Sequence, residues 1–252
     1  MTQPIIRFEG VSKAFGTQTV LRDFSLDVEP GAFVSIIGRS GCGKTTVLKL
    51  VNGLLSPDTG RVLIQGQDVA RIDPVALRRR IGYAIQNVGL FPHMTVEKNI
   101  AYVPAISGLK EWKGKQCREK VAALLKQVGL DPALAGRYPR ALSGGQRQRV
   151  GIARALAAGP ELLLMDEPFG AVDEITRGQL QDQLLRIHRE SGIPVLFVTH
   201  DIAEALKLGT RTLVMDAGQI QQYDAPSRLL AHPATSFVER LVRRSRVFQT
   251  RA

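Results

Sequence analysis

A glycine-rich stretch followed by lysine and two threonines, GRSGCGKTT, occupies Gly38 to Thr46. Its glycines let the backbone turn tightly, so that successive N–H groups can point inward at an anion. Lys44 can then reach the outer oxygens of a phosphate chain, and the Thr45 hydroxyl can bind Mg²⁺. This is the spacing of a phosphate-binding P-loop, and it predicts ATP and Mg²⁺ as ligands. The candidate nucleotide contacts in it are Gly38, Arg39, Ser40, Gly41, Cys42, Gly43, Lys44, Thr45 and Thr46.

Two adjacent carboxylates, Asp166 and Glu167, follow the apolar residues 162–165. Such a run is typical of a strand buried on both faces, and ligands of open α/β sheets bind at the carboxyl ends of their strands. We expect Asp166 to hold Mg²⁺ and Glu167 to polarise the water that attacks the phosphate. A solvated acidic pair without chemistry is the alternative, which the P-loop upstream disfavours.

The pentapeptide LSGGQ, from Leu142 to Gln146, precedes the helical pattern QRQRVGIARALAA. Ser143, Gly144 and Gly145 at a helix N-terminus form an anion site by themselves. One chain already has its phosphate cradle, so a second anion site calls for a different nucleotide. A head-to-tail dimer, in which each LSGGQ caps the ATP in the partner's P-loop, meets this requirement. An ordinary helix cap is the alternative.

Apolar patterning predicts the elements that carry these motifs. Continuously apolar runs separated by helical patterns favour a doubly wound α/β core with a mostly parallel sheet. They are Ala32–Gly38, Leu162–Asp166 and Pro194–His200. The N-terminal segments instead alternate and are interrupted by Gly, Pro and Asp, which favours an antiparallel subdomain. These segments are residues 5–15, 19–31 and 61–69.

Shorter elements follow from local signals. Asp73 and Pro74 open a short helix as its cap and first turn, and the next strand is expected to end at Gln86. A later helix places Val121, Leu124, Leu125 and Val128 on one face, with Gly129 where a C-terminal cap belongs.

One domain is expected to cover residues 1–252. Its P-loop core comprises about 1–87 and 160–252, and a helical subdomain of about 88–159 is inserted into it. The 44% hydrophobic content is ordinary for a globular protein, and the N-terminus lacks the features of a secretion signal. No apolar run approaches the roughly 20 residues that a membrane span needs.

The net charge of +11 suits a nucleic-acid ligand, a nucleotide or an anionic membrane surface. The basic residues are scattered, except for Arg78–Arg80 and a tail from Arg240 to Arg251. Neither cluster is interleaved with aromatic residues, so we expect no nucleic acid as a partner. With only two cysteines, the composition favours a reducing, cytosolic setting.

Along its whole length the chain resembles the ATP-binding subunit of an ABC transporter. The resemblance implies that Phe15 stacks on adenine and that His200 contacts the γ-phosphate. It gives Gln86 the role of sensing Mg²⁺ and the γ-phosphate, and Asp173 a place across the dimer interface. A core phenylalanine and a structural histidine are the alternatives for Phe15 and His200. The segment around Asp173 departs slightly from the common family wording.

The same resemblance implies partners: a second copy of this ATPase, integral membrane permease subunits and, indirectly, a solute-binding protein. The chain would then lie in the cytoplasm, peripherally on the inner face of the cell membrane. Residues 88–104 and 165–184 are similar to ATPases that serve importers of glycine betaine, choline and related osmoprotectants. An importer of amino acids or other small solutes, or a soluble ABC-type ATPase acting on ribosomes or DNA, are alternatives.

Three further expectations concern the region after His200, Cys42 and the C-terminal residues 236–252. Many osmoprotectant ATPases carry a C-terminal regulatory pair of domains, for which the residues after His200 leave no room. Cys42, at a helix start, is expected either to have a lowered thiol pKa or merely to be a small residue that fits, and the second is favoured. Residues 236–252 form either a solvated terminal helix, which is favoured, or a basic amphipathic segment on an anionic membrane.

Overall fold

The computed structural model describes residues 3–249 except 87 and 171, and side chains up to residue 243. The chain divides into two compact units. We call Met1–Leu77 with Pro194–Ala252 the P-loop unit, and Arg78–Ile193 the signature unit. Among the helices described, none is long and apolar enough to span a bilayer.

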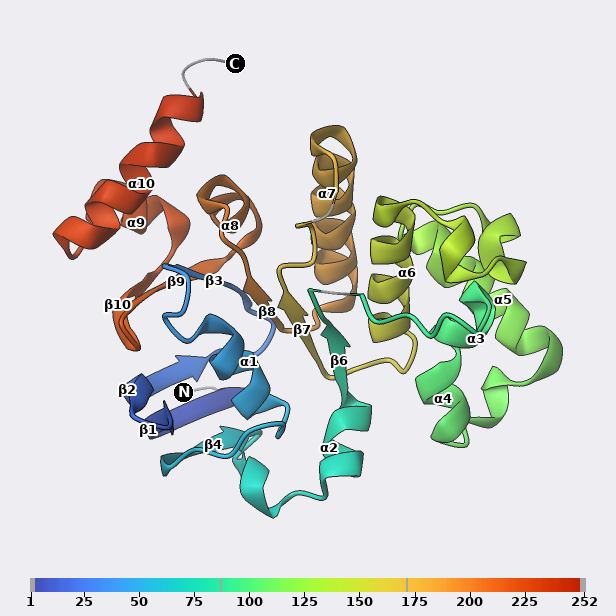
Figure 1. Cartoon of the computed structure of the whole chain (residues 1–252), viewed down its shortest axis with the longest axis horizontal. Helices are drawn as coiled ribbons and strands as arrows, with labels where there is room; N and C mark the ends of the chain where they lie inside the picture. Colours follow the sequence, from blue (N-terminus) through green and yellow to red (C-terminus); the bar gives the residue numbers. More distant parts are fainter. Residues whose placement is uncertain (1–2, 87, 171, 250–252) are drawn as a thin grey trace. The chain divides into compact units, whose positions relative to one another are not determined.

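The first sheet of the P-loop unit is antiparallel, in the order β2-β1-β4-β5 (Figure 1). Its strands are β1 (Ile6–Phe15), β2 (Gln18–Val28), β4 (Thr59–Ile64) and β5 (Gln67–Asp68). This confirms the antiparallel N-terminal subdomain. The expected strand over 61–69 is two strands, because Gln65 and Gly66 both have positive φ and form a tight turn between them.

The second sheet of this unit surrounds β3, the strand that leads into the P-loop. Its order is β10-β9-β3-β8, and β3 pairs in parallel with both neighbours while β10 is antiparallel to β9. The strands are β3 (Phe33–Gly38), β8 (Val195–Val198), β9 (Arg211–Asp216) and β10 (Gln219–Asp224). Every residue of β8 and all but the last of β3 are buried, as the apolar runs predicted.

Helices pack on this second sheet and close its core. They are α1 (Lys44–Val51), α8 (Ile202–Leu208), α9 (Pro226–Ala231) and α10 (Ser236–Gln249). Val238 and Val242 of α10 are buried in one cluster with Ile37, Val214 and Leu229. The C-terminal helix is therefore anchored to the strand that precedes the P-loop.

The chain leaves the P-loop unit within α2 (Pro74–Arg80), and Asp73 caps that helix as expected, accepting a hydrogen bond from Ala76 N. The signature unit then begins with β6 (Ile81–Ala84), which pairs in parallel with β7 (Leu162–Asp166). Gly82 permits close packing against the helix that follows LSGGQ, because a Cβ there would lie 2.4 Å from Ala155 O.

Helices make up most of the remaining signature unit (Figure 1). They are α3 (Val96–Ile100), α4 (Tyr102–Ile106), α5 (Gly114–Gln127), α6 (Gly144–Leu156) and α7 (Glu174–Ser191). Short 3₁₀ turns cover Lys110–Trp112, Pro132–Gly136 and Pro139–Ala141. Val121, Leu125 and Val128 are buried on one face of the α5 region, whereas Leu124, predicted for the same face, is only partly buried. Gly129 has a φ of 68° after the end of the helix. The predicted helix and its glycine cap are confirmed.

Candidate nucleotide-binding site

The P-loop connects β3 to α1 and is shaped by its glycines. Gly43 caps α1 at a φ of 104°, a conformation that favours glycine. A Cβ at this position would lie 2.8 Å from Leu21 Cδ2 and 2.9 Å from Val20 O. No larger residue fits without moving β2, so the loop is held in a tight turn around its own backbone N–H groups.

The Lys44 side chain folds back across this loop. Its Nζ donates hydrogen bonds to Gly38 O at 3.0 Å and to Arg39 O at 2.9 Å, and the residue is only 8% exposed. Both acceptors are neutral carbonyl groups, so these bonds leave the ammonium charge uncompensated. A cation held in this way beside a glycine turn fits a polyanionic phosphate chain.

Phe15 and His200 also belong to the P-loop unit. Phe15 ends β1 and is 48% exposed, so it lies outside the core, and Lys13 Nζ is 5.8 Å from its ring centre. His200 is exposed just after β8, between residues that fix the backbone on either side. Thr199 donates to the buried Glu204 carboxylate and accepts from Asp201 N. The motif analysis missed the roles of Thr199 and Glu204, whose only sequence signal is a threonine directly before the histidine and a glutamate four residues after it.

In the signature unit, Asp166 ends β7 and is 7% exposed. Burial, and secondarily the charge of Asp166, raises the pKa of Tyr83 to about 12. The next residue, Glu167, has a φ of 45°, which a non-glycine residue adopts only under strain. Such strain at the end of a buried strand is typical of functional positions.

Gln86 and Glu167 are brought into direct contact. Gln86 Nε2 donates a hydrogen bond of 2.8 Å to Glu167 Oε2. The expected strand ending at Gln86 stops at Ala84, because its pairing with β7 ends where Ala84 meets Met165. Gln86 therefore lies in the loop beyond the strand and can turn its amide toward the carboxylate.

The LSGGQ segment forms the N-terminus of α6 through a capping box. Ser143 Oγ accepts from Gln146 N at 3.1 Å, while Ser143 N donates to Gln146 Oε1 at 2.9 Å. Asp173 caps α7 in turn by accepting from Thr176 N, and this bond lowers the pKa of Asp173.

One hollow of about 610 Å³ joins these two helix starts. Its lining includes Ser143, Gly144, Gly145, Gln146, Asp173 and Thr176. The structure thus brings together the LSGGQ residues and Asp173, the aspartate that the resemblance assigned to a dimer interface. Arg149 of α6 also lines the hollow and donates to Gly129 O.

Arg154 of α6 is a residue that motif analysis did not single out. Its Nη1 donates to Gly89 O at 2.8 Å and its Nη2 to Val88 O at 2.6 Å. Burial lowers the pKa of this guanidinium. A Cβ on Gly151, one turn earlier, would lie 2.5 Å from Val88 Cγ1. The absence of a side chain at Gly151 therefore allows α6 to pack closely against Val88. The helix that begins at LSGGQ therefore holds the chain just beyond Gln86.

Asn99 holds the following loop in a similar way. It is fully buried, and its Nδ2 donates to the carbonyl groups of Phe91, Met94 and Thr95 while its Oδ1 accepts from Phe91 N. The loop at Phe91–Thr95, inside the segment 88–104 that resembles osmoprotectant ATPases, is thus held by the Asn99 amide. An asparagine inside a helical pattern is the only sequence signal for this role.

Comparison with known proteins identifies the family. The sequence model of the ABC transporter family matches residues 21–170. The chain belongs to this family. The glycine betaine/carnitine/choline transport ATP-binding protein OpuCA of Bacillus subtilis (strain 168) is 46% identical over 248 residues, which are 98% of this chain and 64% of that protein. The glycine betaine uptake system ATP-binding protein YehX of Escherichia coli (strain K12) is 46% identical over 96% of this chain and 77% of that protein.

Solved structures agree with this assignment. A dimeric ATP-binding cassette in a post-hydrolysis state, bound to ADP and Pi, matches with a TM-score of 0.81 and 32% identity. The match covers 88% of this chain and 98% of that one. This chain therefore has the fold of an ABC ATP-binding cassette, and the resemblance and fold class expected from its sequence are confirmed. It spans less than two thirds of the length of OpuCA.

Proposed function

We propose that this chain hydrolyses ATP as a head-to-tail homodimer and thereby powers solute uptake through integral membrane permease subunits. The observation that carries the proposal is the hollow shared by Ser143 and Asp173. The hollow lies at the N-terminus of α6, which can bind a phosphate group, and at Asp173, which we place at the dimer interface. Because Lys44 and the P-loop of the same chain already form one phosphate site, this second site is assigned to the partner's nucleotide. The ADP-bound relative is a dimer, which supports this reading.

The chemistry is assigned residue by residue. Lys44 and the N–H groups from Gly38 to Thr46 bind the phosphates of ATP, and Phe15 stacks on its adenine. Mg²⁺, held by Thr45, Gln86 and Asp166, would neutralise charge on the phosphate oxygens. Glu167 orients and polarises the attacking water, and Gln86 fixes one oxygen of its carboxylate. His200 contacts the γ-phosphate and positions this phosphoryl group for in-line attack by water, with ADP as the leaving group.

The transport role follows from the relatives. The protein acts as a peripheral subunit on the inner face of the cell membrane, and a solute-binding protein supplies the permease. Residues 88–104 form the surface that contacts the permease, with the loop at Phe91–Thr95 held by Asn99. Because OpuCA and YehX are named for glycine betaine, carnitine or choline, the solute is a quaternary-amine osmoprotectant.

The organisation expected from the sequence is retained in this proposal. Residues 1–252 act as one nucleotide-binding domain, with core segments of about 1–87 and 160–252 and a helical subdomain of about 88–159. Nucleic acid is not a partner.

Affinity purification under nucleotide-free and Mg-ATP conditions tests the assembly. The tagged chain should retain an integral membrane protein and show Mg²⁺-dependent ATP hydrolysis, while Lys44→Ala should lose hydrolysis without losing the membrane partner. Retention of ribosomes or DNA in place of a membrane protein would contradict the transport role. Hydrolysis unaffected by Lys44→Ala would contradict the assigned cradle.

A further inference from the structure

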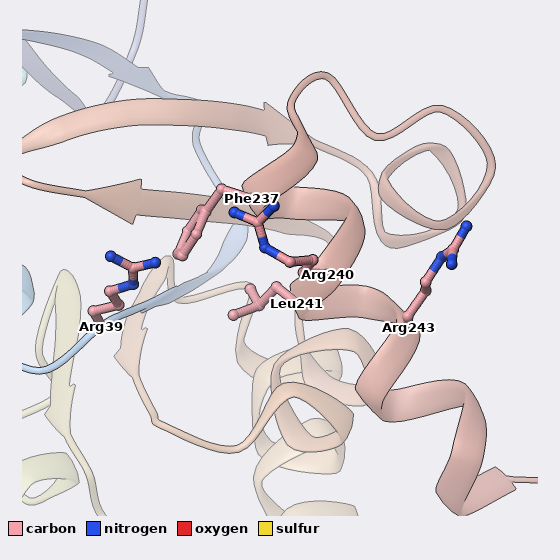
Figure 2. Close-up of a pocket in the computed structure, with 5 residues that line it drawn as sticks. All are labelled: Arg39, Phe237, Arg240, Leu241 and Arg243. Carbon is pink, nitrogen blue, oxygen red and sulfur yellow. The ribbon is translucent and has the colours of Figure 1, made fainter.

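A second hollow lies in the P-loop unit. Only one of its lining residues, Arg39, is also among the residues assigned to ATP. The hollow has a volume of about 520 Å³ and is lined by Arg39, Phe237, Arg240, Leu241 and Arg243 (Figure 2). Arg39 comes from the P-loop, and the other four residues come from α10. Three of the five lining residues carry a guanidinium group.

The helix that supplies most of this lining is a fixed support. Val238 and Val242 of α10 are 0% and 3% exposed within the core of the unit. Phe237 and Leu241 pack against the same core from one side. The apolar face of α10 is therefore occupied over these residues and is not free to enter a bilayer. This disfavours the membrane-inserted reading for the described part of the tail, and leaves the arginines on the outer side.

The arginines that line the hollow are only partly paired with carboxylates in the described part of the chain. Arg39 Nε lies 3.8 Å from Asp216 Oδ1, and Arg243 Nη2 lies 2.7 Å from Glu239 Oε1. Arg240 forms no ion pair with any residue in the described part of the chain. One guanidinium among the three is thus left without a carboxylate.

The Arg39 side chain is already positioned against the Phe237 ring. The Arg39 guanidinium carbon lies 5.1 Å from the centre of the Phe237 ring, a distance at which a cation is attracted to the ring face. In Figure 2, Arg39 and Arg240 lie on either side of Phe237, whereas Arg243 points away. Two guanidinium forks on a rigid support suit the oxygens of a phosphate group, which arginine binds in bidentate fashion.

We propose that this hollow binds a phosphate group and is a second anion site beside the ATP cradle, with Arg39 common to both: its backbone N–H is assigned to the cradle, and its side chain lines the hollow. Arg240 and Arg39 hold the phosphate oxygens, and Phe237 and Leu241 form the apolar floor on which the remainder of the ligand rests. The phosphate comes either from a small molecule in solution or from the headgroup of an anionic phospholipid.

Binding is tested with the full chain saturated with ADP, so that the P-loop is filled. One arm follows the ³¹P line width of inorganic phosphate during titration with protein. The other arm measures co-sedimentation with phosphatidylglycerol vesicles, with phosphatidylcholine vesicles as the neutral reference. The test variant is Arg240→Gln. The matched control is Arg228→Gln, which removes the same charge from an exposed residue of the neighbouring helix α9, away from the hollow.

We expect the wild type to bind in at least one arm, and Arg240→Gln to weaken that binding by about fivefold or more, as loss of one charge-assisted hydrogen bond implies. Arg228→Gln should stay within about twofold of the wild type, the range expected for one distant exposed charge. Binding in the phosphate arm identifies a soluble ligand, and binding in the vesicle arm alone identifies a lipid.

Absence of binding in both arms would overturn the proposal. Equal losses in Arg240→Gln and Arg228→Gln would also overturn it, because they would indicate a diffuse basic surface. Thermal unfolding of both variants establishes that they are folded. The result does not depend on ATP hydrolysis, so this site and the proposed ATPase function can fail separately.

Discussion

Gln86 Nε2 donates a hydrogen bond of 2.8 Å to Glu167 Oε2. The two residues follow β6 and β7, a parallel pair whose carboxyl ends meet at one edge. Glu167 has a strained φ of 45° at the position directly after β7. A neutral amide thus fixes one carboxylate oxygen of the proposed catalytic residue without supplying a countercharge.

Glu167→Gln should leave ATP binding intact and lower turnover by about two to three orders of magnitude, because the group that polarises water is lost. The substituted amide can still accept from Gln86, so the local contact is preserved. The closed dimer should accumulate with Mg-ATP. Turnover assays and size-exclusion chromatography measure these effects, and near-normal turnover would contradict the role of Glu167.

Gln86→Ala removes the hydrogen bond to Glu167 together with the amide oxygen proposed to bind Mg²⁺. We expect turnover to fall by about tenfold or more, since a misoriented general base loses part of its contribution. Equilibrium ATP binding in the absence of Mg²⁺ should be unchanged, because the cradle belongs to the P-loop. Steady-state kinetics with Mg²⁺ measures turnover, and equilibrium nucleotide titration without Mg²⁺ measures binding. A change in Mg²⁺-free binding alone would show that Gln86 does not act through Glu167.

Ser143→Arg tests whether the LSGGQ segment contacts the nucleotide bound in the partner's P-loop. A bulky cation at the α6 N-terminus should block dimer closure and turnover while the monomer still binds ATP. Lys44→Ala should weaken ATP binding itself. Mixing the two variants creates one composite site with intact Lys44 and intact Ser143, which should recover part of the activity. Defects that do not depend on mixing would contradict the shared site.

Arg154→Leu should destabilise the signature unit, because the carbonyl groups of Val88 and Gly89 lose their donors. The bond to Val88 O is partly buried and the bond to Gly89 O is exposed, so we expect their loss to cost about 1 kcal/mol in total and to lower the thermal unfolding midpoint. Arg149→Gln is the control on the same helix, since it breaks one bond, to Gly129 O, on an exposed side. Calorimetry of the two variants provides the comparison, and equal shifts would refute a special role for Arg154.

The P-loop, LSGGQ and the two carboxylates at the end of β7 were identified from the sequence because each is a local pattern of residue types. Arg154 was missed because its role depends on a loop more than sixty residues away in sequence. The strain at Glu167 and the end of β6 at Ala84 depend on strand pairing, which no local spacing encodes. For Cys42 the structure agrees with the favoured expectation of a small residue that fits: the fold buries it, and burial raises the pKa of its thiol more than the nearby charge of Lys44 lowers it.

Cys42 should therefore react slowly with iodoacetamide in the folded protein. Burial raises the pKa of its thiol, so the thiolate forms only at a pH above the range of an exposed cysteine. Because the folded pKa is raised, the associated stability is present below the unfolded pKa and is lost as the pH rises through the folded pKa. Alkylation rates of Cys117→Ser against pH, read by mass spectrometry, measure this. A rate matching that of free cysteine at neutral pH would contradict the burial argument.

Uptake measurements address the solute. Cells that lack this protein should lose ATP-driven uptake of a quaternary amine such as glycine betaine or choline, and the wild-type chain should restore it. Complementation with Lys44→Ala should fail, which ties uptake to the P-loop and not to assembly alone. Labelled betaine, choline and several amino acids are compared in the same strains. A loss confined to amino acids would refute the osmoprotectant assignment, whereas the ATPase chemistry of Lys44 and Glu167 would stand.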